Sequence, residues 1–330
     1  MTEPQVSVDG LSVHYPLGRS LFGRPPVLKA LNRVSLDIPR GSFFGLVGES
    51  GSGKTTLGRA ILRATPISEG RITFRNGDGR FDLADLDDAQ LRAYRRHAQL
   101  IFQDPYGALN PRMTVRDIIA EPLTVMGLTR TRAETDERVR EIAAMCRLNL
   151  EHLRRFPHAF SGGQRQRISI ARTLVCRPQF IVADEAVAAL DVSIQADILN
   201  LLKSLQNELG LTFLFISHDL SVVAHVSDYV AVMYLGTLVE IAPKKELFHQ
   251  PLHPYTKALM SAIPSMDPDD DRKAQRLEGE IPSPTDPPSG CLFHTRCPHA
   301  TERCRTELPE LEHTDGDARV ACHHWRELMT

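Results

Sequence analysis

The chain has 330 residues and a formal net charge of −2, and 42% of its residues are hydrophobic. At roughly 150 residues per domain, this length allows one large α/β domain with an appendage. The balanced charge gives no general basic field, so no nucleic-acid partner is expected. The first residues lack the basic and apolar regions of a signal peptide, and no apolar run reaches the roughly 20 residues of a membrane helix.

Strand and helix patterns alternate along residues 6–241. Strands are predicted at 6–15, 33–38, 43–48, 98–103, 179–184, 211–217, 229–235 and 237–241, and helices at 54–64, 86–97 and 193–209, with a Gly- and Pro-rich loop at 18–30. Such alternation favours an α/β fold with a largely parallel sheet and helices on its faces. The stretch at about 104–176 is mostly helical, and we interpret it as an inserted helical subdomain.

The composition changes near residue 264. The segments 263–272 and 281–290 are dense in Pro and Asp, which indicates an extended linker. We therefore expect a main domain at 1–263 and a small cysteine-containing C-terminal extension at 264–330.

Residues 48–55, GESGSGKT, match the phosphate-binding pattern G-x-x-x-x-G-K-[ST]. The motif follows a predicted strand and opens a predicted helix, which disfavours the alternative of a plain glycine-rich turn. Its glycines let backbone N–H groups turn inward around phosphates, and the helix N-terminus favours anions. Lys54 is expected to bind the β- and γ-phosphates of ATP and Thr55 to bind Mg²⁺. The predicted ATP-binding residues of this loop are Gly48, Glu49, Ser50, Gly51, Ser52, Gly53, Lys54, Thr55 and Thr56.

Polar residues follow three other predicted strands. Asp184 is a second candidate partner of Mg²⁺, through water, and Glu185 is a candidate general base that polarises the attacking water. His218 is a candidate contact of the γ-phosphate, and Gln103 is a candidate bridge to Mg²⁺ or water. Each has a structural alternative, because turns often follow strands ending in carboxylates and a single histidine after a strand is usually structural.

The segment 160–172, FSGGQRQRISIAR, predicts a second anion site. Ser161 is a candidate N-cap, and Gly162 and Gly163 leave the helix N-terminus open to an anion. Because the segment lies in the inserted subdomain, its simplest use is to cap the ATP of another subunit. The alternative is a helix cap that faces only solvent.

These motifs, in this order and spacing over about 6–241, resemble the ATP-binding cassette family. In the family's terms they are the Walker A loop (48–56), the Q-loop (Gln103), the signature (Ser161, Gly162, Gly163, Gln164), the Walker B strand with its glutamate (Asp184, Glu185), the D-loop (Asp191) and the switch histidine (His218). Tyr15 falls where the family stacks an aromatic ring on adenine. The resemblance implies the P-loop NTPase fold and a head-to-tail dimer, in which each ATP lies between the P-loop of one subunit and the signature of the other.

A finer resemblance is to the ATPases of dipeptide and oligopeptide importers. The segments 103–115, 191–202, 251–264 and 282–297 are similar to stretches of that subfamily. This implies a subunit that hydrolyses ATP to energise import of peptides or related small solutes. Its partners would be a second, non-identical ATPase subunit, two membrane permeases and, indirectly, a solute-binding protein, with the chain peripheral on the cytoplasmic face of the plasma membrane.

The chain departs from the family pattern at two positions, and rival functions also have to be considered. Ala186 and Ala188 replace the proline and serine that the family usually has after its catalytic glutamate. A rival function, a cassette ATPase acting on nucleic acid or ribosomes, predicts coiled coils, two cassettes or a basic surface, and an exporter predicts fused membrane helices. The chain shows none of these patterns.

Four cysteines gather in the extension: Cys291, Cys297, Cys304 and Cys322. Clustered thiols in a reducing compartment suit a metal site better than disulfides. The short C-x2–4-C spacing that zinc sites favour is absent, whereas iron–sulfur clusters accept more varied spacing. Some members of the resembled subfamily carry a 4Fe–4S cluster here, so we expect one, with zinc or no metal as alternatives. Cys146 and Cys176 are expected to be ordinary buried residues.

Overall fold

The computed structural model describes residues 3–18, 27–77, 79–262, 277 and 279–329. The chain divides into two compact units: residues 1–6, 38–43 and 73–216 belong to the first, and residues 7–37, 44–72 and 217–330 to the second. The expected linker at 263–272 lies outside the described residues, as does most of the loop at 18–30. A domain boundary at residue 264 therefore stays a prediction.

The first unit contains a parallel set of three strands. These are β6 (Ala98–Ile101), β7 (Phe180–Asp184) and β8 (Thr212–Ile216), and they place Ala98 opposite Phe180 and Phe180 opposite Thr212. Every residue of β7 and β8 is buried, which explains why both are continuous apolar runs. Around them lie α2 (Asp88–His97) and α7 (Val192–Leu209), both at the predicted positions.

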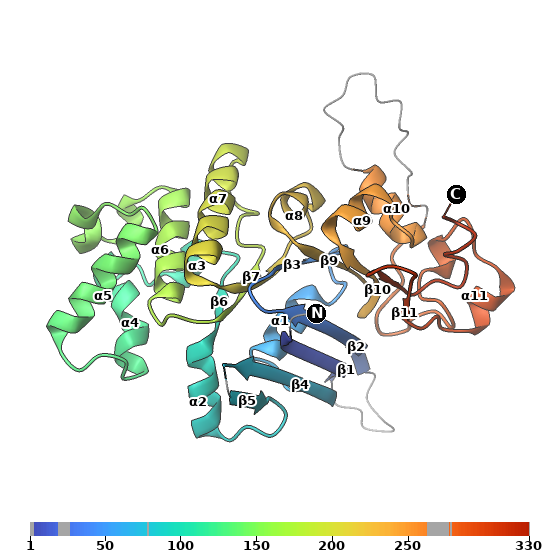
Figure 1. Ribbon diagram of the computed structural model, residues 1–330, viewed down its shortest axis with the longest axis horizontal. Coiled ribbons are helices and arrows are strands. Elements are labelled where there is room, and N and C mark those ends of the chain that lie inside the picture. Colours follow the sequence, from blue (N-terminus) through green and yellow to red (C-terminus); the bar gives the residue numbers. More distant parts are fainter. Residues whose placement is uncertain (1–2, 19–26, 78, 263–276, 278, 330) are drawn as a thin grey trace. The chain divides into compact units, whose positions relative to one another are not determined.

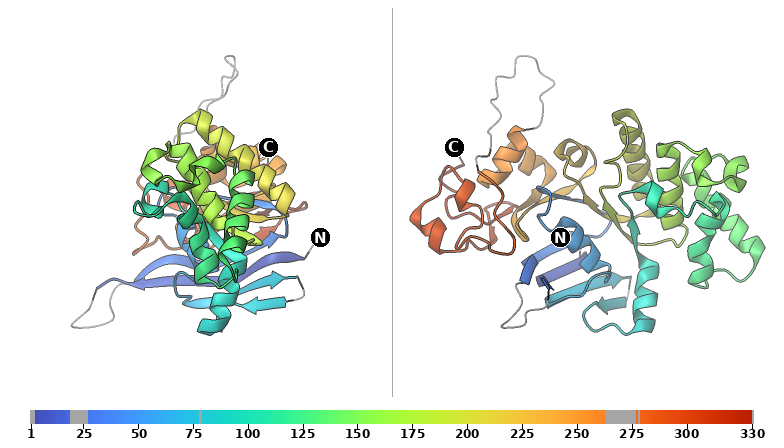
Figure 2. Two further views of the ribbon diagram at one scale, coloured as in Figure 1. Left: turned by 90° about the vertical axis from the view of Figure 1, so that its left-hand side faces the viewer. Right: turned by 180° about the vertical axis from the view of Figure 1, so that it is seen from behind.

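Helices fill most of residues 104–176, as predicted. They are α3 (Pro105–Ala108), α4 (Val115–Val125), α5 (Arg132–Met145) and α6 (Gly162–Leu174), with 3₁₀ turns η1 (Leu150–Arg154) and η2 (Pro157–Ala159). Figures 1 and 2 show α4, α5 and α6 gathered in one group, and these three helices pack on one another. Threonine N-caps define where two of them begin, Thr114 for α4 and Thr131 for α5.

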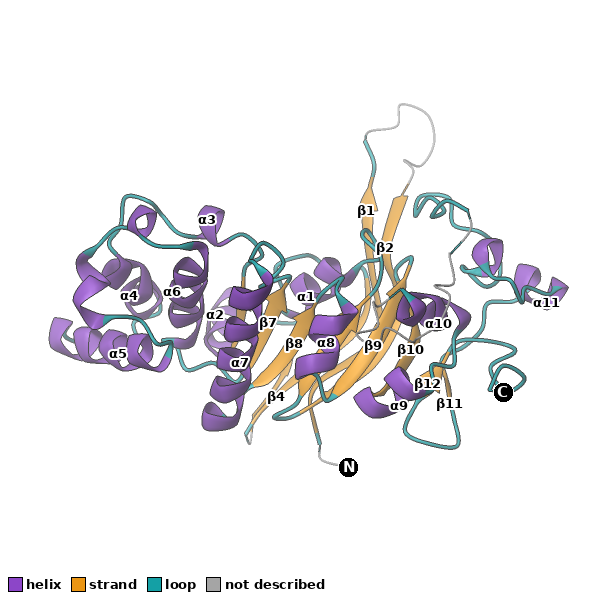
Figure 3. Ribbon diagram, turned by 90° about the horizontal axis from the view of Figure 1, so that it is seen from above, coloured by secondary structure: helices purple, strands orange, loops and turns teal. Residues whose placement is uncertain are grey.

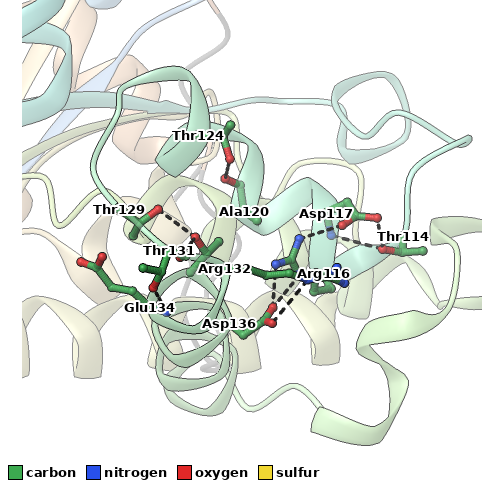
Figure 4. A network of polar contacts seen from close by, with 11 residues as sticks. Thr114, Arg116, Asp117, Ala120, Thr124, Thr129, Thr131, Arg132, Glu134 and Asp136 are labelled. Carbon is green, nitrogen blue, oxygen red and sulfur yellow. Dashed lines mark hydrogen bonds and ion pairs between the residues drawn. The ribbon is translucent and has the colours of Figure 1, made fainter.

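A polar network joins α4 to α5 (Figure 4). The Arg116 guanidinium on α4 contacts Asp136 on α5, with Nη2 to Oδ1 at 2.6 Å, and it also contacts Asp117 at 3.0 Å. The Thr114 hydroxyl donates a hydrogen bond of 2.7 Å to the Asp117 carboxylate. This hydrogen bond and the nearby Arg116 lower the pKa of Asp117.

The second unit is built on a mixed sheet (Figure 3). From Phe44, β3 (Phe43–Val47) runs parallel to β9 (Tyr229–Tyr234), which forms an antiparallel hairpin with β10 (Thr237–Pro243). The hairpin turn at Leu235 and Gly236 has positive φ at both residues, as a tight hairpin requires. On β3, a Cβ at Gly45 would lie 2.5 Å from Val223 Cγ1, so α8 (Leu220–Val226) packs directly on the strand.

A further sheet combines two predicted strands with strands that the sequence did not predict. β1 (Pro4–Pro16) matches the strand predicted at 6–15. β2 (Val27–Pro39) contains the strand predicted at 33–38 but begins at Val27, inside the predicted loop at 18–30, and the sheet order β2-β1-β4 adds β4 (Glu69–Asn76). Within the first unit, residues 73–76 pair antiparallel with β5 (Gly79–Asp82). Only three of the eight residues of β4 are buried, which explains why no clear strand pattern marks it.

The described part of the C-terminal extension is integrated into the second unit. Its strands β11 (Glu312–His313) and β12 (Arg319–Val320) add to β10, and the Ala321 amide donates to the Val239 carbonyl at 2.9 Å. The other elements are α9 (Lys244–His249), α10 (Pro254–Ser261), η3 (His294–Arg296) and α11 (Glu302–Thr306). Among the described residues, no helix has the length and apolar character needed to cross a membrane.

Candidate functional site

The predicted site residues are distributed over both units. The first unit holds Gln103, Ser161, Gly162, Gly163, Gln164, Asp184, Glu185 and Asp191, and the second holds Tyr15, residues 48–56 and His218. The residues of each unit are described in turn.

The loop between β3 and α1 (Lys54–Ile61) depends on glycine at two positions. Gly48 has a φ of 150°, and a Cβ there would lie 2.1 Å from the Met233 carbonyl oxygen. Gly53 has a φ of 103°, and its Cβ would lie 2.5 Å from the Ala30 carbonyl oxygen. Both backbone conformation and space therefore exclude a side chain. Because Gly53 is also the N-cap of α1, no side-chain cap occupies that helix end, which suits an anion.

The Lys54 ammonium lies inside this loop. Its Nζ donates to the carbonyl oxygens of Gly48 at 2.7 Å and Glu49 at 2.8 Å, and to the Ser52 hydroxyl at 3.3 Å. The residue is only 6% exposed, and a buried ammonium needs such acceptors. The charge is thus held at the loop, where a phosphate oxygen can compete with the carbonyls for its three donors.

Sequence reasoning missed the partners of Glu49. The Arg296 guanidinium binds the Glu49 carboxylate with two hydrogen bonds, of 2.7 and 3.1 Å. The Tyr255 hydroxyl accepts a hydrogen bond from the Glu49 amide at 2.9 Å. Arg296 lies in the sequence FHTRC of the extension, 247 positions away from Glu49, and no local pattern pairs the two.

In the first unit, the structure brings Gln103 and Glu185 together. The Gln103 side-chain amide donates to the Glu185 carboxylate at 2.7 Å. Glu185 follows β7 with its amide bonded to the Ile216 carbonyl at 2.9 Å and a φ of 48°. This left-handed conformation is uncommon for a residue other than glycine, and in this chain it also occurs at turns such as Leu235. Asp184, at the end of β7, is 8% exposed.

The start of α6 confirms Ser161 as an N-cap. The Ser161 hydroxyl accepts from the Gln164 amide, and the Gln164 side chain accepts from the Ser161 amide at 3.0 Å, which forms a capping box. A Cβ on Gly163 would lie 2.5 Å from Ile194 Cγ2. Glycine is therefore required here by packing against α7, apart from any contact with an anion.

The remaining predicted residues lie in varied surroundings. The Tyr15 hydroxyl is 2.6 Å from the Thr65 hydroxyl, which fixes the ring at the end of β1. Asp191 is the exposed N-cap of α7 and makes no side-chain capping bond, and His218 is exposed. Of the two substituted alanines after Glu185, Ala186 is buried and Ala188 is exposed.

The four cysteines of the extension line one small pocket. Burial raises the pKa of Cys291 to about 12 and that of Cys322 to about 11. The donor types suit a metal, but among the described residues no three or more His, Cys, Asp or Glu side chains are arranged to hold a metal ion. The expected 4Fe–4S cluster is thus not supported by this structure. Cys146 and Cys176 are buried, as expected.

Comparisons with known proteins identify the family. Residues 31–188 match the family model described as ABC transporter, and residues 239–304 match the oligopeptide/dipeptide transporter C-terminal region. A putative peptide import ATP-binding protein from Brucella ovis is 52% identical over 98% of each chain. The di/tripeptide transport ATP-binding protein DppF from Pseudomonas aeruginosa is 44% identical over 99% of each chain. The chain belongs to the ATP-binding cassette family.

Solved structures of ATP-binding cassettes agree with this. A dimeric cassette in a post-hydrolysis state bound to ADP and Pi is 29% identical, with a TM-score of 0.63 over 72% of this chain and 98% of that one. CbiO1 from Clostridium perfringens, part of an ABC transporter complex, is 26% identical, with a TM-score of 0.63 over 74% of this chain and 91% of that one. The predicted P-loop NTPase fold is confirmed, and this ATP-binding cassette protein is an ATPase that uses ATP with Mg²⁺.

Proposed function

We propose that this ATP-binding cassette protein is the ATP-hydrolysing subunit of an importer for peptides or related small solutes. The observation that carries the proposal is the whole-chain likeness to peptide import and transport ATP-binding proteins, at 44–52% identity. The match of residues 239–304 to the oligopeptide/dipeptide transporter C-terminal region supports it independently of the ATPase motifs.

The geometry of the loop in the second unit supports the roles that we propose for the P-loop residues. Lys54 gives its charge to the β- and γ-phosphates, and the first-turn N–H groups of α1 bind phosphate oxygens. The Thr55 hydroxyl would be a ligand of Mg²⁺, which neutralises charge on the phosphates when bound. Tyr15 would stack on the adenine ring, and His218 would contact the γ-phosphate.

The first unit supplies the groups that act on water. Glu185 accepts a proton from the attacking water, and Gln103, which donates to its carboxylate at 2.7 Å, keeps that carboxylate in place. Asp184 would bind Mg²⁺ through water. Asp191 would act as the D-loop residue at the subunit interface.

We further propose that the site is completed in trans. Ser161, Gly162, Gly163 and Gln164 at the start of α6 would close the ATP bound by a second, non-identical ATPase subunit. The dimeric cassette among the similar structures supports this arrangement by analogy. Two membrane permeases would be driven by the ATPase dimer at the cytoplasmic face of the membrane, and a solute-binding protein would deliver the peptide.

Reconstitution tests this function. The chain is co-purified with its second ATPase subunit and permeases and placed in proteoliposomes with a radiolabelled tripeptide and the solute-binding protein. The proposal predicts ATP-dependent peptide transport that is lost in the Glu185→Gln complex. Hydrolysis that does not depend on the tripeptide and drives no transport would contradict the importer function. Hydrolysis that ribosomes stimulate would favour the rival cassette function.

We also propose, from the type of donor atoms alone, that the C-terminal extension holds an iron–sulfur cluster. Its four thiols line one pocket. Cys291, Cys297, Cys304 and Cys322 would be the ligands, and no step of ATP hydrolysis depends on them. Anaerobically purified protein should then contain iron and acid-labile sulfide. Metal-free protein with all four thiols open to alkylation would rule the cluster out.

A further inference from the structure

A residue of the C-terminal extension holds the P-loop through the side chain of Glu49. Arg296 Nη1 lies 2.7 Å from one carboxylate oxygen and Nη2 lies 3.1 Å from the other. The Arg296 side chain is 5% exposed and that of Glu49 is 24% exposed, so solvent screens this pair much less than a surface ion pair. A two-point contact also fixes orientation, which a single ammonium would not do.

Aromatic side chains shape the place where the guanidinium lies. It sits 5.9 Å from the centre of the Tyr234 ring, and Arg296 Nη1 is 3.5 Å from the Tyr234 hydroxyl. Tyr234, Tyr255 and Phe293 contact one another with ring centres 4.8–5.4 Å apart, and all three are buried. An arginine guanidinium is always charged in proteins, so the positive charge beside Glu49 is permanent.

Glu49 is thereby held at three separate points. Its carboxylate binds Arg296, its amide donates to the Tyr255 hydroxyl at 2.9 Å, and its carbonyl oxygen accepts from Lys54 at 2.8 Å. When Lys54 turns to a phosphate, the third contact is given up. The other two contacts, both made by residues beyond 250, keep the loop in shape.

We propose that Arg296 is a positioning residue for the binding of ATP. Arg296 holds the P-loop through Glu49, and it compensates the negative charge of Glu49 beside the phosphates. The proposal rests on the proposed binding of ATP by residues 48–55. Without Arg296, the Glu49 carboxylate would be free to move and would repel a triphosphate. The extension therefore tunes the affinity for nucleotide.

The extension does not depend on this ion pair to stay folded. β12 is hydrogen-bonded to β10, and Phe293 packs against both tyrosines. Replacing Arg296 should therefore change the loop without detaching the extension. A matched control is available in the same segment, because Arg303 pairs with Glu307 at 2.8 Å while the two side chains are 59% and 58% exposed.

The test compares Arg296→Met with Arg303→Met in the full chain, using a fluorescent ATP analogue with Mg²⁺ for affinity and ATP hydrolysis in the purified complex for KM and kcat. Arg296→Met should weaken nucleotide binding and raise KM about tenfold or more, because truncation leaves Glu49 uncompensated, with kcat changed less than about threefold. Arg303→Met should match the wild type in all three quantities. The double variant E49Q/R296M should recover most of the affinity, since the uncompensated charge is gone.

The outcomes separate the two levels of the argument. If Arg296→Met binds nucleotide as well as the wild type does, or if the double variant binds no better than Arg296→Met, Arg296 has no role in compensating Glu49. If Arg296→Met does not fold, Arg296→Lys replaces it: it keeps the charge, loses the two-point contact, and should show an intermediate affinity. Failure of the wild type itself to bind ATP, or wild-type binding by Lys54→Ala, contradicts the proposed function instead.

Discussion

Glu185 combines an unusual backbone conformation with a side-chain hydrogen bond. Its backbone is in the left-handed region, with a φ of 48°, and its carboxylate accepts a hydrogen bond from Gln103 at 2.7 Å. The hydrogen bond orients the carboxylate, and a general base has to lie within hydrogen-bond reach of the proton that it takes. A glutamine at this position has the same shape and can still accept from Gln103, but it cannot take a proton.

Replacement of Glu185 by Gln should separate binding from hydrolysis. Mg-ATP affinity should stay within about threefold of the wild type, while the single-turnover hydrolysis rate should fall by roughly 10²–10⁴, the usual contribution of a general base. Rapid-quench measurement of ADP formation tests this. Glu208→Gln, an exposed change at the end of α7, is the matched control. Wild-type turnover in Glu185→Gln would remove Glu185 from this role.

Gly48 offers a second test at the scale of a residue. Gly48→Ala should lose most nucleotide binding, because its Cβ would come 2.1 Å from the Met233 carbonyl oxygen and force the loop to move. Gly127→Ala is the control: Gly127 also has positive φ, 62°, but nothing lies within 4 Å of its Cβ position. The control should lose about 1 kcal/mol of stability and keep its ATP affinity. Equal ATP affinity in Gly48→Ala would mean that the loop tolerates the displacement.

At the scale of elements, the junction of α4 and α5 depends on a few polar contacts (Figure 4). The Thr114 hydroxyl caps α4 by accepting from the Asp117 amide and also donates to the Asp117 carboxylate. Asp117 and Asp136 in turn share the Arg116 guanidinium. The cap therefore orients one of the two carboxylates that fix the arginine joining the helices.

Thr114→Ala should lower the free energy of unfolding by about 1 kcal/mol near pH 7, the typical loss for an N-cap, whereas Thr114→Ser should change it little. The pKa of Asp117 is lowered in the folded state, so its stabilising contact with Thr114 is present above the unfolded value of 3.8 and is lost as the pH falls below it. The difference between wild type and Thr114→Ala should thus narrow at about pH 3. Urea unfolding at both pH values checks this, and a constant difference would contradict the role of the carboxylate.

How far the sequence predicts the elements depends on their burial. β7 and β8 are buried on both faces and appear as continuous apolar runs, so they were predictable to within a residue or two. β4 is mostly polar and only three of its eight residues are buried, and β11 and β12 have two residues each. Such strands form because a neighbouring strand pairs with them, and the sequence of the strand itself does not reveal that partner.

The candidate site likewise combines residues that a local sequence pattern predicts with residues that only the fold brings together. The P-loop was predictable because its glycines and its lysine lie within one short stretch, residues 48–55, that matches a known pattern. The contact between Gln103 and Glu185 follows from their places at the ends of neighbouring parallel strands, β6 and β7. The pairing of Arg296 with Glu49 was not predictable, because it depends on how the extension folds back within the second unit.

At the scale of the whole molecule, the C-terminal extension and the P-loop belong to the same compact unit. β12 adds to the sheet of that unit, and Arg296 contacts the loop directly. The described part of the extension therefore belongs to the same compact unit as the P-loop. This agrees with relatives that match this chain over 98–99% of its length, extension included.

The central claim is that the loop around Lys54 holds the ATP on which every other role depends. Equilibrium binding of radiolabelled Mg-ATP to the wild type, Lys54→Ala and the exposed control Lys245→Ala tests it most directly. The wild type and Lys245→Ala should each bind one ATP per chain with the same affinity. Lys54→Ala should bind at least about tenfold more weakly, because a buried charged contact to phosphate is lost. Equal affinity in all three proteins would contradict the assignment of this loop as the ATP site.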